Sequence, residues 1–237
     1  GVITSVDGVV LSPKLYDYGW SENDYFRDTF DNTLRYEEGM ACVHLNGKYG
    51  FIDLNGQEVI PLIYDYADDF SEGLALVKVD DEYGFIDKEG KTVIPFRDHE
   101  WCEGFSEGLA SFRMFSKYGF ISKKGKWDIA AIYDSVESFE EGASIVSLNN
   151  KYGVIDKRGK VIIPFKYEYM RRVYNRNFFE VKLHNKHGVI NRDGDIIIPI
   201  KYDYIDRNFD FACDTDKVFI PVISNHKYGF VDKTGKE

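Results

Sequence analysis

The fold is decided by the stretch at residues 83–95, Tyr-Gly-Phe-Ile-Asp-Lys-Glu-Gly-Lys-Thr-Val-Ile-Pro. This stretch recurs along the chain in a fixed register. A near copy, Tyr-Gly-Val-Ile-Asp-Lys-Arg-Gly-Lys-Val-Ile-Ile-Pro, occupies residues 152–164. Aromatic–Gly pairs recur at spacings of 34, 35, 34, 35 and 41 residues, and they are Tyr49-Gly50, Tyr83-Gly84, Tyr118-Gly119, Tyr152-Gly153, His187-Gly188 and Tyr228-Gly229. This period is typical of repeat proteins, in which each copy is one unit that stacks on its neighbours.

The register also divides the chain. A second glycine follows six residues after the first in every copy, and a proline follows five residues later in four of them. Residues 1–36 form a degenerate N-terminal copy with an insertion, residues 37–203 form the regular repeats, and residues 204–237 form an irregular C-terminal copy. We therefore expect one repeat domain over residues 1–237. The chain begins and ends inside a repeat, which indicates either a trimmed chain or closure by pairing of the two ends.

Residues 71–98 indicate how one unit folds. Residues 74–79 alternate in the manner of a strand with one buried face. Residues 83–87 and 92–94 are the predicted second and third strands, and Gly90 provides a left-handed position in the hairpin turn between them. Pro95 is expected to end the third strand, because proline cannot donate a hydrogen bond to a sheet. The unit is therefore predicted to be a three-stranded meander followed by a loop, with at most a short helical turn.

The first glycine of each copy lies inside a predicted strand, where glycine usually permits the close approach of another backbone or ring. We expect the aromatic residue before it to lie across the adjacent unit. Burial of one apolar side chain contributes about 1.5–3 kcal/mol, so a single meander buries too little and neighbours must share a core. The predicted inward positions of the first strands are Ala41, Val43, Leu45, Ala75, Val77, Val79, Ala110, Phe112, Met114, Ser144, Val146 and Leu148.

These features predict an all-β fold of tandem β-meander repeats, each about 35 residues long, stacked as an open curved array. The alternative is a closed β-propeller. A repeat of this length is short for a four-stranded blade, but the split repeat at the two termini favours closure.

Composition narrows the possible partners. The formal net charge of −10 argues against general nucleic-acid binding, which needs a basic surface. No apolar run approaches the roughly 18 residues of a membrane helix, so we expect a soluble protein without membrane insertion. The cysteines Cys42, Cys102 and Cys213 have neither a disulfide nor a metal-site spacing and are expected to be buried or half-buried thiols. We expect neither a cofactor nor a metal, and the oligomeric state is open.

The repeated phrases resemble the WG-repeat family of bacterial proteins, which is named for a Trp-Gly dipeptide followed by apolar residues, a Gly turn and Pro. Here Tyr replaces the Trp in five copies and His187 replaces it in another. The Phe-Ser-Glu-Gly-Leu-Ala phrases at residues 70–75 and 105–110 match the family as well. The resemblance implies an all-β repeat, often an interaction module, with no catalytic residues to carry over. It implies a bacterial protein, either cytoplasmic or exported with its leader removed.

Tyrosines flank an acid in the connectors between units. In stacked repeats they would form rows that stack sugars or bind peptides, although one Tyr could instead pack under the next unit while the acid caps a turn. The candidate ligand-binding residues in these connectors are Tyr64, Tyr66, Tyr167, Tyr169, Tyr202 and Tyr204.

Two insertions interrupt the repeat. The first, at residues 17–36, includes the candidate binding residues Trp20, Tyr25 and Phe26, and it either caps the stack or forms a partner-binding patch. The second contains Asp206, Asp210, Asp214 and Asp216; it lacks the glycine and glutamate of an EF-hand and is interpreted as a solvated acidic loop.

A polar stripe is predicted on the outward side of the first strands. It consists of His44, Lys78, Arg113, Ser147 and Lys182. A cationic stripe could hold an anionic ligand, but a solvated strand face with long side chains is the favoured interpretation. His184 and His187 are three residues apart, which on a strand puts them on opposite faces and argues against a shared metal.

No common catalytic motif occurs in its required context. The favoured hypothesis is a non-catalytic repeat scaffold that binds a protein or peptide partner, because varied exposed residues recur on a constant framework. The alternative is a carbohydrate-binding module that uses the rows of tyrosines and acids. An enzyme is the least favoured hypothesis.

Overall fold

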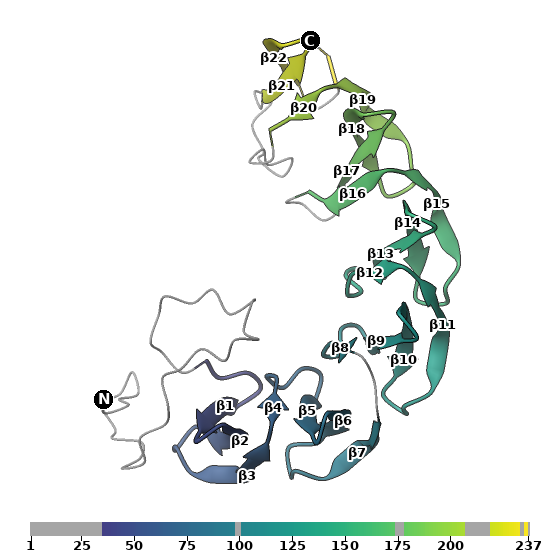
Figure 1. Cartoon of the computed structure of the whole chain (residues 1–237). Helices are drawn as coiled ribbons and strands as arrows, with labels where there is room; N and C mark the ends of the chain where they lie inside the picture. The colour runs from purple at the N-terminus through teal and green to yellow at the C-terminus, as the bar shows by residue number, and fades with distance from the viewer. Residues whose placement is uncertain (1–34, 98–100, 174–177, 207–218, 233–234, 237) are drawn as a thin grey trace. The chain divides into compact units, whose positions relative to one another are not determined.

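The computed structural model describes residues 35–97, 101–173, 178–206, 219–232 and 235–236. These residues form short strands joined by tight turns, and helices are absent from them (Figure 1). No helix in this described part of the chain is long and apolar enough to cross a membrane. The predicted all-β fold of tandem meanders is confirmed.

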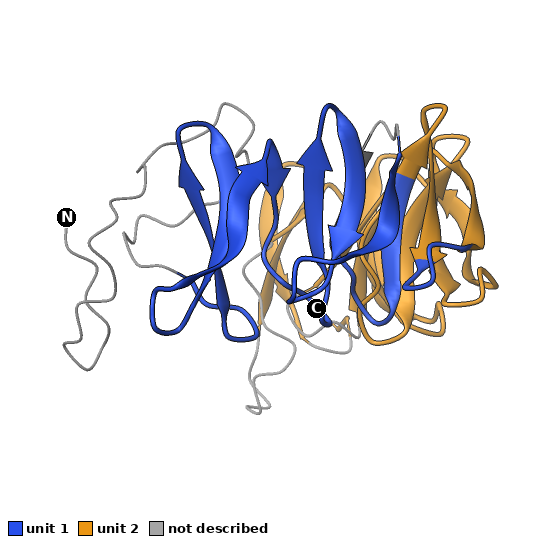
Figure 2. Ribbon diagram, turned by 90° about the horizontal axis from the view of Figure 1, so that it is seen from below, with its two compact units in different colours: residues 1–112, 122–126 blue, residues 113–121, 127–237 orange. Residues whose placement is uncertain are grey.

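The chain divides into two compact units, which are coloured separately in Figure 2. Unit 1 comprises residues 1–112 and 122–126, and unit 2 comprises residues 113–121 and 127–237. The single repeat domain over residues 1–237 stays a prediction.

Six small antiparallel sheets follow one another along the described residues. The first sheet contains β1 (Met40–Leu45), β2 (Lys48–Asp53) and β3 (Glu58–Tyr64). The next two contain β4 (Tyr66–Ala67), β5 (Ala75–Val79), β6 (Glu82–Ile86) and β7 (Thr92–Arg97), and then β8 (Trp101–Cys102), β9 (Leu109–Met114), β10 (Lys117–Ser122) and β11 (Trp127–Tyr133).

The remaining three sheets belong to unit 2. Two of them contain β12 (Ser135–Val136), β13 (Ala143–Leu148), β14 (Lys151–Asp156) and β15 (Val161–Tyr167), and then β16 (Tyr169–Arg172), β17 (Phe178–Leu183), β18 (Lys186–Asn191) and β19 (Ile196–Tyr202). The last contains β20 (Tyr204–Ile205), β21 (Ile220–Ser224) and β22 (Lys227–Val231).

A short strand that was not predicted precedes the first hairpin in five of these sheets, as β4, β8, β12, β16 and β20. The two-residue β12, for example, pairs with β13 through Ser135↔Ser147 and Val136↔Val146. The Tyr-acid-Tyr connectors lead into this strand, and they form no helical turn in the described residues. The cause is pairing with the next hairpin, because the Asp134 N–H donates to the Ser147 carbonyl at 2.8 Å.

The third strand runs through its proline in the four units that have one, so the prediction that proline ends this strand is wrong. In β15, Ile163 faces Val154 whereas Tyr167 faces Tyr152, which is a bulge around Pro164. The bulge interrupts the ladder at the proline. Because β15 is also the edge of its sheet, the missing N–H is tolerated there.

In the five sheets that have a third strand, the glycine of the aromatic–Gly pair makes room for this bulge. A Cβ on Gly153 would lie 2.6 Å from the Ile163 carbonyl oxygen, and one on Gly50 would lie 2.6 Å from the Ile60 oxygen. The predicted close approach of a backbone is confirmed, and the backbone is that of the third strand of the same sheet. The second glycine also behaves as predicted, since Gly159 has a φ of 77° in its hairpin turn.

Neighbouring sheets share their interiors, as the sequence predicted. In unit 1 one cluster joins the first two sheets, with Phe51 and Ile60 on one side and Ala75, Val77 and Ile86 on the other. Unit 2 has clusters of the same kind, one joining β12–β15 to β16–β19 and one joining β16–β19 to β20–β22.

Both faces of the first strand are buried, whereas the sequence predicted one. Ala75 and Val77 are buried as expected, but Leu76 on the opposite face is only 2% exposed. Leu76 lies opposite Phe85, and the Phe85 ring packs against that of Phe105 at a centroid distance of 4.8 Å. The last predicted inward position of each first strand is half-buried rather than buried, at Leu45, Val79, Met114 and Leu148.

Glutamates in the Glu-Gly turns connect successive repeats. Glu38 has a φ of 53°, which is uncommon for a residue other than glycine. Its carboxylate accepts a hydrogen bond from the Gly73 N–H at 3.1 Å, and its carbonyl accepts one from Lys88 at 2.8 Å. In unit 2, Arg192 makes the corresponding ion pair with Glu141 at 3.1 Å. These contacts join residues about one repeat or more apart in sequence.

Replacement of Gly153 by alanine tests the close approach. The new β-carbon would collide with backbone atoms, so we expect the free energy of unfolding to fall by about 1–3 kcal/mol, measured by chemical denaturation. Gly104→Ala is the matched control, because a β-carbon at that position would have no neighbouring atom within 4 Å. Equal stability of the two variants would contradict the proposed role of the glycine.

Candidate functional site

The first tyrosine of each connector is a core residue. Tyr64, Tyr167 and Tyr202 are 6%, 1% and 1% exposed, so these three rings offer a ligand almost no surface. Burial also raises the pKa of Tyr64. These rings fill the space under the next sheet, which matches the packing interpretation of the connector.

The second tyrosine of each connector is more accessible. Tyr66 and Tyr169 are half-buried and Tyr204 is exposed. Tyr66 packs against Tyr49 at a centroid distance of 5.9 Å, and Tyr169 packs against Tyr152 at 6.4 Å. The tyrosine before the glycine thus reaches the adjacent sheet, as expected. A ligand-binding role for the second row stays a prediction.

The acid between the two tyrosines caps the first hairpin of the next sheet, as one interpretation of the sequence expected. The Asp65 carboxylate accepts from the Asp80 N–H at 2.9 Å, and the Asp134 carboxylate accepts from the Asn150 N–H at 3.0 Å. Glu168 accepts from two successive N–H groups at 3.1 Å each. Asp203 accepts from the Asn225 N–H at 2.6 Å.

A lysine of the preceding sheet completes this arrangement at three connectors. The ion pairs are Lys48–Asp65, Lys117–Asp134 and Lys186–Asp203. The lysine hydrogen bond, followed by the backbone N–H, lowers the pKa of each of these aspartates. At Glu168 the backbone hydrogen bond from Asn185 is the main cause of the lowered pKa. These acids therefore have structural partners.

The polar stripe is half-buried or buried rather than solvated. Lys78 lies over the Tyr83 ring at 5.4 Å and forms an ion pair with Asp81 at 2.7 Å. Arg113 lies over the Tyr118 ring at 5.5 Å. Ser147 is buried and lies 2.6 Å from the Ser135 hydroxyl. The long side chains of Lys78 and Arg113 thus cover apolar rings, as expected, but the stripe is half-buried or buried and not fully solvated.

A buried ionic cluster occupies the fifth repeat. The Glu180 side chain is 1% exposed; its carboxylate accepts from Arg171 Nε at 2.6 Å and lies 2.7 Å from His187 Nδ1. His184 lies in the preceding turn, with a φ of 50°, rather than on a strand. No group of three or more metal-ligating side chains occurs in the described ranges.

The sequence contains a signal for this cluster that a search for known motifs misses. Glu180 faces Val189, and the residues at the same position in other sheets are Leu76 and Ile145. A charged residue thus replaces apolar ones in the same copy in which His187 replaces tyrosine. Paired departures from a repeat indicate contact between the two positions.

Exposed apolar side chains recur on the third strands. In unit 1, Val59, Ile63 and Val93 are 44%, 55% and 42% exposed. In unit 2 the same strands of successive sheets expose Trp127, Ile132, Val161, Ile162 and Ile196. Apolar side chains repeated on edge strands make a surface suited to a protein partner.

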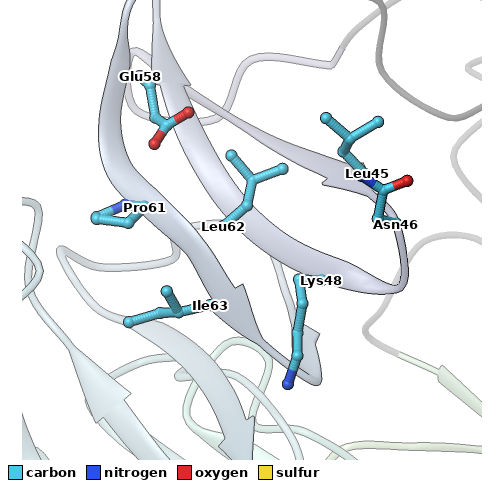
Figure 3. Close-up of a pocket in the computed structure, with 7 residues that line it drawn as sticks. All are labelled: Leu45, Asn46, Lys48, Glu58, Pro61, Leu62 and Ile63. Carbon is cyan, nitrogen blue, oxygen red and sulfur yellow. The ribbon is translucent and has the colours of Figure 1, made fainter.

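A shallow hollow of about 350 Å³ lies on this surface in unit 1, between the β1–β2 hairpin and β3 (Figure 3). Its apolar lining is Leu45, Pro61, Leu62 and Ile63, and its polar lining is Asn46, Lys48 and Glu58. The hollow combines an apolar floor with opposite charges, which suits a short peptide segment.

The remaining residues that the sequence analysis singled out are the insertions and the cysteines. Trp20, Tyr25, Phe26, Cys213, Asp210, Asp214 and Asp216 lie outside the described residues. Cys42 is half-buried and Cys102 is buried, as expected, and burial raises the pKa of the Cys102 thiol.

The chain belongs to the family described as WG containing repeat, which matches residues 49–83, 83–117, 118–152, 152–186 and 188–212. These matches confirm the resemblance that the sequence suggested. The chain matches no curated protein sequence.

The chain is similar to solved structures at low sequence identity. A crystal structure of a eukaryotic initiation factor is 10% identical with a TM-score of 0.55, and the alignment covers 86% of this chain and 63% of that one. Hsv2 of Kluyveromyces lactis with a complete loop 6CD is 12% identical with a TM-score of 0.46, over 68% of this chain and 60% of that one. The chain spans less than two thirds of either protein. The likeness to the initiation factor concerns the fold alone, which is propeller-like.

The connector acids give a testable pH dependence. The folded pKa of Asp134 lies below the ordinary value of 3.8, so its ionised form stabilises the fold fully above that value. This contribution disappears as the pH falls through the lower folded pKa. We expect Asp134→Asn to lower the melting temperature at pH 7, with a difference from the wild type that shrinks toward pH 3.

Asp128→Asn, at an exposed position on β11, is the matched control and should leave the melting temperature unchanged at each pH. A difference for Asp134→Asn that stays constant from pH 7 to pH 3 would show that its charge is not the stabilising feature.

The buried cluster gives a second prediction. Arg171→Met leaves the Glu180 charge with His187 alone, and we expect a loss of about 3–5 kcal/mol in the free energy of unfolding. The triple variant Arg171→Met, Glu180→Leu, His187→Tyr removes all three ionisable groups, and its leucine and tyrosine are the residues at the same positions of another copy, Leu76 and Tyr83. It should recover most of this loss in chemical denaturation, and a triple variant less stable than Arg171→Met would contradict the prediction.

Proposed function

We propose that this protein is a non-catalytic repeat scaffold that binds a protein or peptide partner. The observation that supports the proposal is the recurrence of exposed apolar side chains on the third strands. In unit 2, Ile132 and Ile196 are 50% and 59% exposed, although both belong to well-packed sheets. Such exposure contributes nothing to the fold and suits a surface that a partner covers.

The chemistry of this surface defines the class of partner. Lys166 and Lys201 lie on the same edge strands, over the rings of Tyr167 and Tyr202 at 5.1 and 5.3 Å. Arg158 and Lys160 are exposed in the turn before β15. The partner surface should therefore combine apolar side chains with carboxylates, because lysines held on rings are already ordered.

The contacts of the polar residues also support a scaffold. The connector acids hold turns, and Lys78 and Arg113 of the stripe stack on tyrosines. The acids thus join a connector to the next sheet, whereas Lys78 and Arg113 stack on tyrosines of their own sheet, and in both cases the polar groups serve the fold.

The proposal is tested with the double variant Ile132→Ser, Ile196→Ser. The wild-type chain is used to capture partners from a lysate of the source cells, and the captured protein is purified for calorimetric titration. We expect the double variant to bind it at least about tenfold more weakly, the effect of losing about 1.4 kcal/mol at an interface.

The control is Asp128→Ser, which changes an exposed polar residue on the same β11 strand and should leave the affinity unchanged. Both variants should unfold at the wild-type denaturant concentration, because the altered side chains are exposed. Equal affinity of the wild type and the double variant would contradict the proposal.

A further inference from the structure

The turn between β9 and β10 differs in composition from the turns at the same position of the other sheets. It consists of Phe115 and Ser116, whose φ angles are 50° and 61°. A two-residue turn with positive φ at both positions favours Gly, Asn, Asp or His, which tolerate the left-handed backbone. The other five sheets have such residues, at Asn46-Gly47, Asp80-Asp81, Asn149-Asn150, His184-Asn185 and Asn225-His226.

Phenylalanine is an unfavourable residue for this position. In the left-handed conformation the β-carbon of an L-residue lies too close to the following carbonyl oxygen, and a bulky residue there is an outlier. Asparagine fits the same turn at a lower cost, as Asn149 does in the next sheet. Backbone strain of this kind is concentrated at binding and catalytic sites. The turn itself therefore does not explain why residue 115 is a phenylalanine.

The Phe115 ring also contributes little to the core. It is 85% exposed, whereas Phe112 on the same strand is 1% exposed. The turn that carries the ring is nevertheless well held. Lys117, the residue after the turn, forms an ion pair with Asp134, and Asp134 accepts a hydrogen bond from the Asn150 N–H at 3.0 Å. A strained backbone and an exposed ring are two separate observations, and neither benefits the fold.

We propose that Phe115 is the anchor by which the β9–β10 hairpin binds an apolar pocket of a folded protein partner. This inference deepens the proposed function and rests on it. A ring on a rigid two-residue turn is ordered before binding, so its insertion into a pocket costs little conformational entropy. Aromatic side chains that enter a pocket and are surrounded by polar contacts contribute most of the binding energy in many interfaces.

The surroundings of Phe115 define the pocket. Asn149 and Asn150 are exposed in the corresponding turn of the next sheet, which the contacts of Asp134 join to the β9–β10 hairpin. The charges of Lys117 and Asp134 are already paired with each other. The partner should therefore have an apolar pocket for one phenyl ring, bordered by uncharged hydrogen-bonding groups that face the two amides. A folded protein offers such a preformed pocket, whereas a flexible peptide does not.

The probe for the test is the protein that the wild-type chain captures from the source cells, purified for calorimetric titration. Phe115→Asn should bind it at least about tenfold more weakly, because the pocket loses its ring. The same substitution should raise the melting temperature of the free chain by about 2–4 °C, because asparagine suits the turn better. A residue that only supports the fold would not show a loss of affinity together with a gain in stability.

Ser116→Gly is the matched control. It introduces into the same turn the residue that the first sheet has at this position, Gly47, and it keeps the ring, so the affinity should stay at the wild-type value. A direct readout of burial comes from trifluoromethyl-phenylalanine incorporated at position 115 of the full chain. Its fluorine resonance should shift when the captured protein is added.

Four results would overturn the inference: equal affinity of the wild type and Phe115→Asn, an equal loss of affinity in Ser116→Gly, a fluorine resonance that the captured protein does not move, or a Phe115→Asn chain less stable than the wild type. The last result would mean that the ring serves the fold. If Phe115→Asn binds normally while the double variant Ile132→Ser, Ile196→Ser loses affinity, only the Phe115 site is rejected and the proposed function stands. If the wild-type chain captures no protein, both are rejected.

Discussion

The close approach of the third strand to the glycine of the aromatic–Gly pair, as at Gly50 and Gly153, is the constraint on which the rest of the repeat depends. With backbone atoms 2.6 Å from where a β-carbon would be, only glycine allows the bulge that carries Pro61 or Pro164. The bulge leaves tyrosine opposite tyrosine at the end of the ladder, as in Tyr49↔Tyr64. From that point the connector passes to the next sheet. The contact at the glycine therefore determines where the chain leaves one sheet and enters the next.

Neighbouring sheets share a core because each connector leads directly from one sheet into the next. First strands such as β5 are buried on both faces, because the preceding sheet covers Ala75 and Val77 while Leu76 lies beside Phe85 and the rings that pack on it. A short meander has too little apolar surface to be stable alone. The connector acids reinforce the stacking with hydrogen bonds to turns of the next sheet, such as Asp134 to Asn150.

The features that could be predicted from the sequence were those set by neighbouring residues. Turn glycines such as Gly159, the alternation of Ala75 and Val77, and the shared core all follow from local pattern and length. The short strand β12 could not be predicted, because it exists only by pairing with β13. The burial of Tyr64 and Tyr167 depends equally on the next sheet, so the rows of candidate tyrosines divided into a buried row and a partly exposed row. The Arg171–Glu180–His187 cluster required comparison of copies with one another.

The packing also determines where binding can occur. Because stacking uses both faces of the first strands, such as the one that carries Ala75, Leu76 and Val77, these strands have no free surface for a partner. The third strands keep an outer side, and it is there that Ile63 and Ile132 are exposed. The side chains that stacking leaves exposed are therefore set by the same packing that buries the first strands.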